Sequence, residues 1–206
     1  SLNTELDIIS ALSNAAGAAG RRHAVILMVE LGDLREGIMT TDLDAFVRQT
    51  LRFPHIDLHG IGANLACFNG IAPDVNNMRE LSRIADHLDR VFATVGSSIS
   101  CVVSGGNSSN LEWAAKANDT GRINDLRLGE SILLGMDPLH DTPIAGLFTD
   151  AITLYGEVIE AKTKPSQPWG EFARSPFARS ASHDLHGDVS QMVLALGHQD
   201  VDPDGL

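Results

Sequence analysis

The sequence predicts an α/β fold with a parallel sheet, followed by a shorter stretch of antiparallel β structure. Apolar segments rich in branched residues recur between residues 24 and 135 and alternate with segments of helical periodicity, the pattern of βαβ units. After about residue 145 the apolar residues alternate with period two and no helix follows, which is typical of antiparallel strands. We therefore predict domains at 1–140 and 141–206, with the boundary between 137 and 148.

Four segments are predicted as strands of the parallel sheet. Residues 24–31 (AVILMVEL) are almost continuously apolar, as in a strand that is covered on both faces. The other three are residues 56–65, 100–109 and 125–135. Four βα units cannot close a barrel, whose interior needs about eight strands to be filled. A small doubly wound fold and a barrel with further βα units upstream both remain open on this pattern alone.

Amphipathic helices are expected between these strands. Asn3 or Thr4 is expected to cap the first helix, which ends in the region 17–20. Later helices are indicated by apolar residues at helical spacing, namely Leu43, Phe46, Val47 and Leu51 in one, Leu81, Ile84, Leu88 and Val91 in the next, and a short helix at 111–117. In the second domain we expect strands at 151–161 and 192–196.

Composition restricts the function classes. The net charge of −12 argues against a nucleic-acid binder, which needs a basic patch for phosphates. No apolar run approaches the roughly 18 residues of a membrane span, and no signal peptide is evident. Cys67 and Cys101 match no disulfide or metal-ligand spacing, so we expect reduced thiols and a cytoplasmic protein. The sequence lacks an initial Met and ends in a turn-like VDPDGL, so both ends are expected to be cut.

Polar and glycine residues follow each of the four predicted strands. They include Asp33, Arg35 and Glu36 after the first strand and Asn64 after the second. Since active sites of parallel α/β barrels form at the carboxyl ends of the strands, these loops together suggest one ligand pocket. The alternative is that βα loops are commonly rich in Gly, Asn and Asp.

The last two loops indicate an anion site. Residues 104–109 (SGGNSS) open a helix, so their N–H and hydroxyl groups could bind a phosphate; a simple turn with a serine cap is the alternative. Arg127 is predicted at a strand end, where a guanidinium is costly to bury without a partner. Its partner is either a ligand or one of the carboxylates Asp125 and Glu130.

Four segments in this order resemble the alanine-racemase-like family of pyridoxal-phosphate enzymes, and the ornithine racemase branch in particular. They are residues 26–38 (ILMVELGDLREGI), 60–70 (GIGANLACFNG), 103–109 (VSGGNSS) and 124–135 (NDLRLGESILLG). The resemblance covers nearly the whole chain and is weaker at about 166–189. It implies the second half of a (β/α)8 barrel followed by the start of a mostly β domain. It also implies a homodimeric amino-acid racemase (isomerase) with pyridoxal 5′-phosphate, acting on an ornithine-, lysine- or alanine-like substrate.

The resemblance also implies roles for particular residues. Arg127 matches the arginine that faces the pyridine nitrogen of the cofactor. Its guanidinium keeps its proton, so the ring nitrogen stays unprotonated and racemisation is favoured over transamination. Asn64 stands where alanine racemases have a histidine near the ring. Arg35 matches an arginine near the cofactor hydroxyl and the substrate carboxylate, and the phosphate falls at Ser108, Gly129 and Glu130, with Asn107 beside them.

Two expected catalytic groups are missing from this pattern. The Schiff-base lysine of the family ends the first barrel strand, and the lysines here, Lys116 on a helix and Lys162 and Lys164 in a predicted turn, have no such place. Tyr155, the one tyrosine, lies in the first predicted strand of the β domain and is not assigned as the second base. Covalent catalysis needs the lysine, so this segment alone is expected to bind the cofactor weakly and to catalyse nothing.

Other candidates have simpler explanations. Cys67 could be a thiol base, but a small buried apolar residue is the favoured interpretation. We expect no metal site, because the remaining histidines lack a third ligand and are interpreted as surface or loop residues: His55, His59, His183 and His186 beside Asp184 and Asp188, and His198, for which a place at a dimer active site stays open. A non-catalytic pyridoxal-phosphate carrier and an inactive relative are the alternative functions. The predicted strands after the barrel count against the carrier.

Overall fold

A computed structural model of the chain describes residues 1–93, 102–171 and 187–201. The chain divides into two compact units, Ser1–Ile152 and Thr153–Leu206. Cys101, His183, Asp184 and His186 lie outside the described residues. Within the described part of the chain, no helix is long and apolar enough to cross a membrane.

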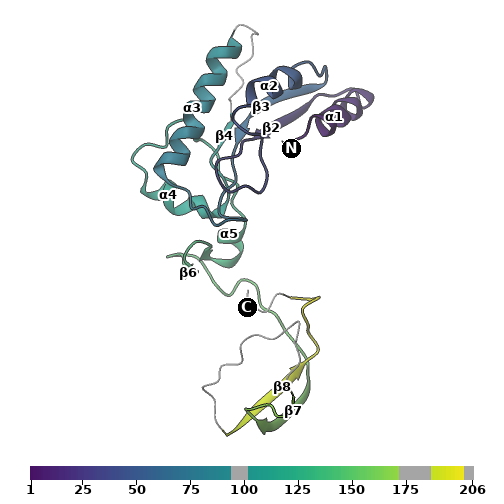
Figure 1. Cartoon of the computed structure of the whole chain (residues 1–206), viewed down its shortest axis with the longest axis vertical. Coiled ribbons are helices and arrows are strands. Elements are labelled where there is room, and N and C mark those ends of the chain that lie inside the picture. The colour runs from purple at the N-terminus through teal and green to yellow at the C-terminus, as the bar shows by residue number, and fades with distance from the viewer. Residues whose placement is uncertain (94–101, 172–186, 202–206) are drawn as a thin grey trace. The chain divides into compact units, whose positions relative to one another are not determined.

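The first unit is built on a four-stranded sheet with the order β1-β2-β3-β4 (Figure 1). The strands are β1 (Leu2–Asn3), β2 (His23–Met28), β3 (Ile56–Gly62) and β4 (Val102–Ser104). Every adjacent pair is parallel, as the alternation of strands and helices predicts. A Cβ on Gly60 would lie 1.9 Å from the Val102 carbonyl oxygen, so the close approach of β3 and β4 requires glycine there.

Two predictions at the edges of this sheet are wrong. Residues 125–135 are not a strand: Asp125 forms an isolated parallel bridge with Ser104, and helix α5 (Glu130–Leu134) follows. The apolar residues Ile132 and Leu133, which suggested a buried strand, are instead exposed on α5. At the N-terminus, Leu2–Asn3 pair with β2, and the helix cap is Glu5 without a side-chain hydrogen bond. A helical spacing of apolar residues does not reveal a two-residue strand before it.

The helices lie close to their predicted ranges. They are α1 (Leu6–Ala18), α2 (Leu43–Thr50), α3 (Val75–Phe92) and α4 (Leu111–Lys116), with a 3₁₀ turn η2 (Ser108–Asn110) before α4. Helix α3 begins at a capping box, in which the Asp74 carboxylate accepts from the backbone N–H groups of Asn76 and Asn77 and the Asn77 side chain returns a bond. Of the residues predicted to point inward, Val91, Phe46 and Leu51 are partly buried and the others are buried.

One hydrophobic core joins the sheet to the helices. Alternate residues of β2 enter it: Val25 and Leu27 are fully buried in the cluster, whereas Ile26 is half-buried, the alternation that a strand imposes. Helices contribute the rest, including Ile9, Val47, Leu81, Leu88 and Phe92. The core therefore holds the strands against the helices, and the loops that carry the polar residues follow the carboxyl ends of these strands.

The remaining described strands are antiparallel, as predicted for the second unit but not for the short pair that ends the first. In the first unit β5 (Met136–Asp137) pairs with β6 (Thr142–Pro143). In the second unit β7 (Val158–Pro165) pairs with β8 (Asp188–Leu194). The predicted strand at 151–161 begins later than expected, so Tyr155 precedes β7 and its side chain is 87% exposed. Lys162 and Lys164 lie in β7, not in a turn, and both pair with Glu160.

Candidate functional site

Arg127 reaches back across the carboxyl ends of β3 and β4. Its guanidinium donates to the Ser104 hydroxyl at 2.6 Å, the Ala63 carbonyl at 2.9 Å and the Asn64 side-chain oxygen at 3.4 Å. Among the described residues no carboxylate forms an ion pair with it, so the expected alternative of a salt bridge to Asp125 or Glu130 is not realised. Burial lowers the pKa of Arg127, and the charges of Asp125 and Glu36 offset part of that effect. The arginine is therefore a half-buried cation held by neutral oxygens.

Two asparagine amides form the centre of the site. The Asn107 side chain donates to the Asn64 side-chain oxygen at 2.9 Å and to the Leu65 carbonyl at 3.0 Å. Asn64 thus receives hydrogen bonds from both Asn107 and Arg127 on one oxygen. The Asn107 side-chain oxygen also accepts from the Ser109 N–H at 2.8 Å, which fixes the turn into η2. Loops that follow β3 and β4 are thereby joined by side chains predicted from the sequence.

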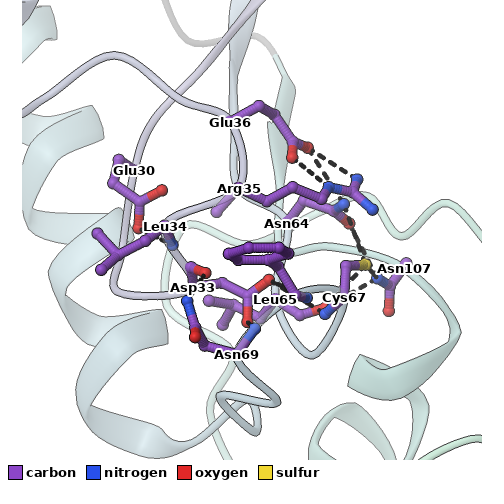
Figure 2. Close-up of polar contacts among 12 residues, drawn as sticks. Glu30, Asp33, Leu34, Arg35, Glu36, Asn64, Leu65, Cys67, Asn69 and Asn107 are labelled. Carbon is purple, nitrogen blue, oxygen red and sulfur yellow. Dashed lines mark hydrogen bonds and ion pairs between the residues drawn. The ribbon is translucent and has the colours of Figure 1, made fainter. Parts of the chain in front are cut away.

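Arg35 enters the same network through Glu36. The guanidinium of Arg35 makes a bidentate pair with the Glu36 carboxylate, at 2.5 and 3.1 Å, and the Asn64 amide donates to Glu36 at 3.2 Å. This pairing lowers the pKa of Glu36 and raises that of Arg35. Figure 2 shows Arg35, Glu36, Asn64 and Asn107 as one group. The structure therefore brings together the loops after β2, β3 and β4 and the segment after the Asp125 bridge, through Arg35, Asn64, Asn107 and Arg127.

Ser108 lies beside this group in a second set of polar contacts. Its side chain is buried, and its Oγ accepts from the backbone N–H groups of Gly129 at 3.2 Å and Ser131 at 3.1 Å. The Ser131 hydroxyl lies 3.2 Å away. Glu130 is exposed between these two residues. Ser131, which the sequence analysis did not single out, could have been noticed from its place in the same GES segment.

Two further residues of the site were missed or misjudged. Cys67 is exposed, so its interpretation as a buried apolar residue is wrong. Its Sγ lies 3.3 Å from the Asn64 amide nitrogen and 3.1 Å from that of Asn107. Asp33 was noted at the strand end but given no role, and its carboxylate binds the loop that carries Cys67. The position of Asp33 directly after a buried strand could have indicated its role. For Cys67 the sequence shows only that it lies near Asn64.

The other candidates lie away from this network. Lys116 pairs with Glu112 on α4, and the His59 side chain is exposed on β3. The His55 ring packs over Gly17. His198 lies in the turn after β8, in the second unit. None of the described lysines belongs to the strand-end group.

The arrangement suits a flat polar ligand that carries an anion. Arg127 and the asparagine amides gather donors at one place. At another place lie the neutral N–H groups of Gly129 and Ser131, whose acceptor is the Ser108 Oγ and which are of the kind that binds anions. A Cβ on Gly129 would meet no atom within 4 Å, so the backbone there is open to an incoming group. The site as a whole is a donor-rich group of residues at the carboxyl ends of parallel strands, which is where α/β barrel enzymes bind their ligands.

Comparisons with known proteins agree with this architecture. The family model of the alanine racemase N-terminal domain matches residues 4–137, more than half of the chain. The chain is 37% identical to ornithine racemase of Acetoanaerobium sticklandii over 207 residues and 32% identical to lysine racemase of Thermotoga maritima over 200 residues. It covers 58% and 54% of these relatives, which match 100% and 97% of the chain. The chain thus spans little more than half their length.

Solved structures support the fold. The alanine racemase of Streptomyces coelicolor A3(2) superposes with a TM-score of 0.56 at 20% identity, over 80% of this chain and 42% of that one. The alanine racemase of Clostridium difficile 630 gives 0.52 at 14% identity, over 94% and 47%. The parallel sheet is therefore a part of a racemase-type barrel, followed by β structure. The chain belongs to the alanine racemase N-terminal domain family.

Proposed function

We propose that this chain forms the arginine and phosphate side of the cofactor site in a pyridoxal-phosphate-dependent amino-acid racemase. The observation that carries the proposal is the half-buried guanidinium of Arg127, which is held only by neutral oxygens among the described residues and adjoins the N–H groups around the Ser108 Oγ. A basic amino acid such as ornithine or lysine is the proposed substrate, since the relatives named above act on these two. The activity is proposed for a protein that also supplies a Schiff-base lysine.

The residues present fit the phosphate of this cofactor. The backbone N–H groups of Gly129 and Ser131 converge on the Ser108 Oγ, which accepts from both. A phosphate needs several donors of this kind, and it would have to take the place of the serine hydroxyl as their acceptor. These groups carry no charge, so a phosphate in that place would meet no competing ion pair. Asn107 places its amide on the Asn64 side of the same turn.

Arg127 determines the chemistry that the site favours. Pyridoxal phosphate, when bound, withdraws electrons from the substrate and acidifies the Cα proton. A guanidinium keeps its proton at neutral pH, so Arg127 would donate a hydrogen bond to the ring nitrogen without protonating it. By leaving the ring nitrogen unprotonated, Arg127 would favour racemisation over transamination. The bonds from Arg127 to Ser104 and Ala63 hold the guanidinium in that orientation.

Arg35 and Asn64 would border the substrate. Arg35 is exposed and its guanidinium is bound by Glu36 on one side, which leaves donors on the other for a substrate carboxylate. Where alanine racemases have a histidine near the ring, this chain has Asn64, whose amide is neutral and does not titrate. A homodimer, a cytoplasmic location and domains divided at 1–140 and 141–206 are proposals that accompany this function.

The test uses the full-length gene product. We expect it to bind pyridoxal phosphate with a visible absorbance that borohydride abolishes, and to interconvert the enantiomers of ornithine or lysine in a chiral chromatography assay. A protein that never shows the absorbance would end the proposal. One that binds the cofactor but leaves both enantiomers of every basic amino acid unchanged would instead be a carrier.

A further inference from the structure

Three side chains outside the strand-end group converge beside the first turn of α4. Glu112 lies on α4, Asp137 on β5 and His140 in the turn between β5 and β6. One carboxylate oxygen of each acid and one imidazole nitrogen of His140 all lie within 4.8 Å of one another. Asp137 and His140 are close in the sequence, but Glu112 comes from a separate helix. The fold therefore brings a third possible metal ligand to the other two.

The distances between these atoms suit one metal ion that takes one atom from each residue. His140 Nδ1 lies 2.9 Å from Asp137 Oδ2 and 3.7 Å from Glu112 Oε2. Two ligand atoms that each lie about 2.0–2.1 Å from a tetrahedral zinc are about 3.4 Å apart, so small side-chain shifts would suffice. The second oxygen of Glu112 is bound by Lys116, and that of Asp137 accepts from the Leu139 N–H at 2.9 Å. Each carboxylate is thereby held with its other oxygen near the imidazole.

The chemistry of the three groups favours a transition metal over a hard cation. An imidazole nitrogen is a preferred ligand of Zn²⁺, whereas Ca²⁺ and Mg²⁺ take oxygen ligands. Two carboxylates and the ammonium group of Lys116 leave the place with a net negative charge, which attracts a cation. Two carboxylates and one imidazole form a set of three protein ligands, and zinc sites with three protein ligands keep a fourth position for water or another ligand.

A cavity of about 580 Å³ opens beside this group, between α3 and α4. Cavities of about 300–1,000 Å³ accommodate small ligands. Glu112 and Leu139 line the cavity, so the metal group borders it. Arg79 and Trp113 line it as well, and Arg79 forms no ion pair in the part of the chain that the structure describes. The cavity therefore offers room, and a free positive charge, for a water or a small anion as the fourth ligand.

We propose that Glu112, Asp137 and His140 bind one divalent transition-metal ion of the Zn²⁺ class. The ion would connect α4, which follows Ser108–Asn110 directly, to β5, which follows α5. It would stabilise the first unit, because it binds the folded chain in preference to the unfolded one. His140 was not among the histidines weighed from the sequence, since Glu112 is distant in the chain. The site needs neither cofactor nor substrate, so it stands apart from the proposed function.

Metal binding is measured by titration calorimetry of the 206-residue chain with Zn²⁺ and with Mg²⁺, after removal of bound metal. We expect Zn²⁺ to bind more tightly than Mg²⁺. His140→Gln and Asp137→Asn should each weaken zinc binding by at least about 100-fold, the upper end of what loss of a supporting residue costs. Asn at position 137 keeps an oxygen for the Leu139 N–H. The control His59→Gln removes an exposed histidine on β3 and should bind zinc like the wild type.

A fourth variant distinguishes a metal site from structural damage. Lys116→Gln removes the cation that competes for Glu112 and should tighten zinc binding by about fivefold, as expected for loss of one unit charge about 4 Å away in water. A damaged fold would not bind zinc more tightly. Excess zinc should also raise the urea midpoint of the wild type and not that of His140→Gln. Zinc binding that is absent in the wild type, equal to that of Mg²⁺, or unchanged in His140→Gln would overturn the proposed site and leave the proposed function untouched.

Discussion

Replacement of Arg127 by Glu reverses the charge at the centre of the site on a shorter side chain. The guanidinium donates to Ser104, Ala63 and Asn64, and a carboxylate can only accept. The variant therefore loses all three bonds and sets an anion against three oxygens. Arg127→Gln loses most of the same bonds without adding the negative charge, so it is the matched control.

The structural cost follows from the bonds that are lost. Hydrogen bonds to charged groups contribute about 1.5–3 kcal/mol each when well made; the bond to Asn64 is long at 3.4 Å. Two effective bonds give a loss of about 3 kcal/mol in the free energy of unfolding of the first unit. With a urea dependence of about 2 kcal/mol per molar, the unfolding midpoint falls by about 1.5 M. Both variants should show a loss of this order, and the Glu variant the larger one.

The ratio of the two reactions distinguishes the effect of the negative charge from the effect of lost stability. In the proposed cofactor site, a Glu carboxylate at position 127 would stabilise a protonated ring nitrogen and would thereby favour transamination. We expect the ratio of transamination to racemisation to rise in Arg127→Glu and not in Arg127→Gln, measured by release of keto acid and by chiral chromatography on the full-length protein. An Arg127→Glu enzyme that retains its cofactor and its wild-type ratio would refute the placement of Arg127 against the ring.

Three further predictions concern Ser108, the loop bound by Asp33 and the sheet. Ser108→Ala removes the acceptor of the Gly129 and Ser131 N–H groups and should lower the free energy of unfolding in urea by about 2 kcal/mol; no change would mean that water replaces the hydroxyl. The pKa of Asp33 is depressed in the fold, so its contribution is present above the unfolded value near 3.9 and is lost as pH falls through the lower folded value. Hydrogen exchange of residues 67–71 should accelerate only below about pH 4, and acceleration at higher pH would contradict this. Gly60→Ala would place a Cβ 1.9 Å from the Val102 oxygen and should cost about 3 kcal/mol or prevent folding, whereas Gly129→Ala, with φ −137° and open space, should unfold like the wild type.

The strand-end loops were predictable because parallel strands bring their carboxyl ends to one edge. The residue pattern therefore predicts that Arg35, Asn64 and Asn107 lie together, and in the structure Asn64 bonds to Asn107 and contacts Arg35 through Glu36. Arg127 also joins Asn64, although the strand predicted to carry it is not formed. Helix positions followed equally well from apolar spacing. These features depend on period and order, which a sequence displays directly.

What escaped prediction depends on the partners that a backbone finds in three dimensions. Residues 125–135 are as apolar as a strand, yet the Ser108 hydroxyl binds the N–H groups of Gly129 and Ser131 and α5 begins there. Asp33 is buried because four N–H groups of a distant loop surround its carboxylate, and no local pattern announces such a partner. Cys67 follows Ala66, which has a positive φ. Alanine rarely adopts this conformation, so the sequence gives no reason to expect a turn there.

The proposed function depends most on binding of a phosphorylated pyridine by the strand-end residues. Titration of the 206-residue chain with pyridoxine 5′-phosphate and with pyridoxine tests this directly, because neither ligand has an aldehyde that could react with Lys116, Lys162 or Lys164. We predict that the phosphate ester binds at least about tenfold more tightly, as expected of a charge-assisted hydrogen bond worth about 1.5 kcal/mol or more, and that Ser108→Ala removes most of the difference. Equal affinities for the two ligands, or a preference that survives Ser108→Ala intact, would contradict the account.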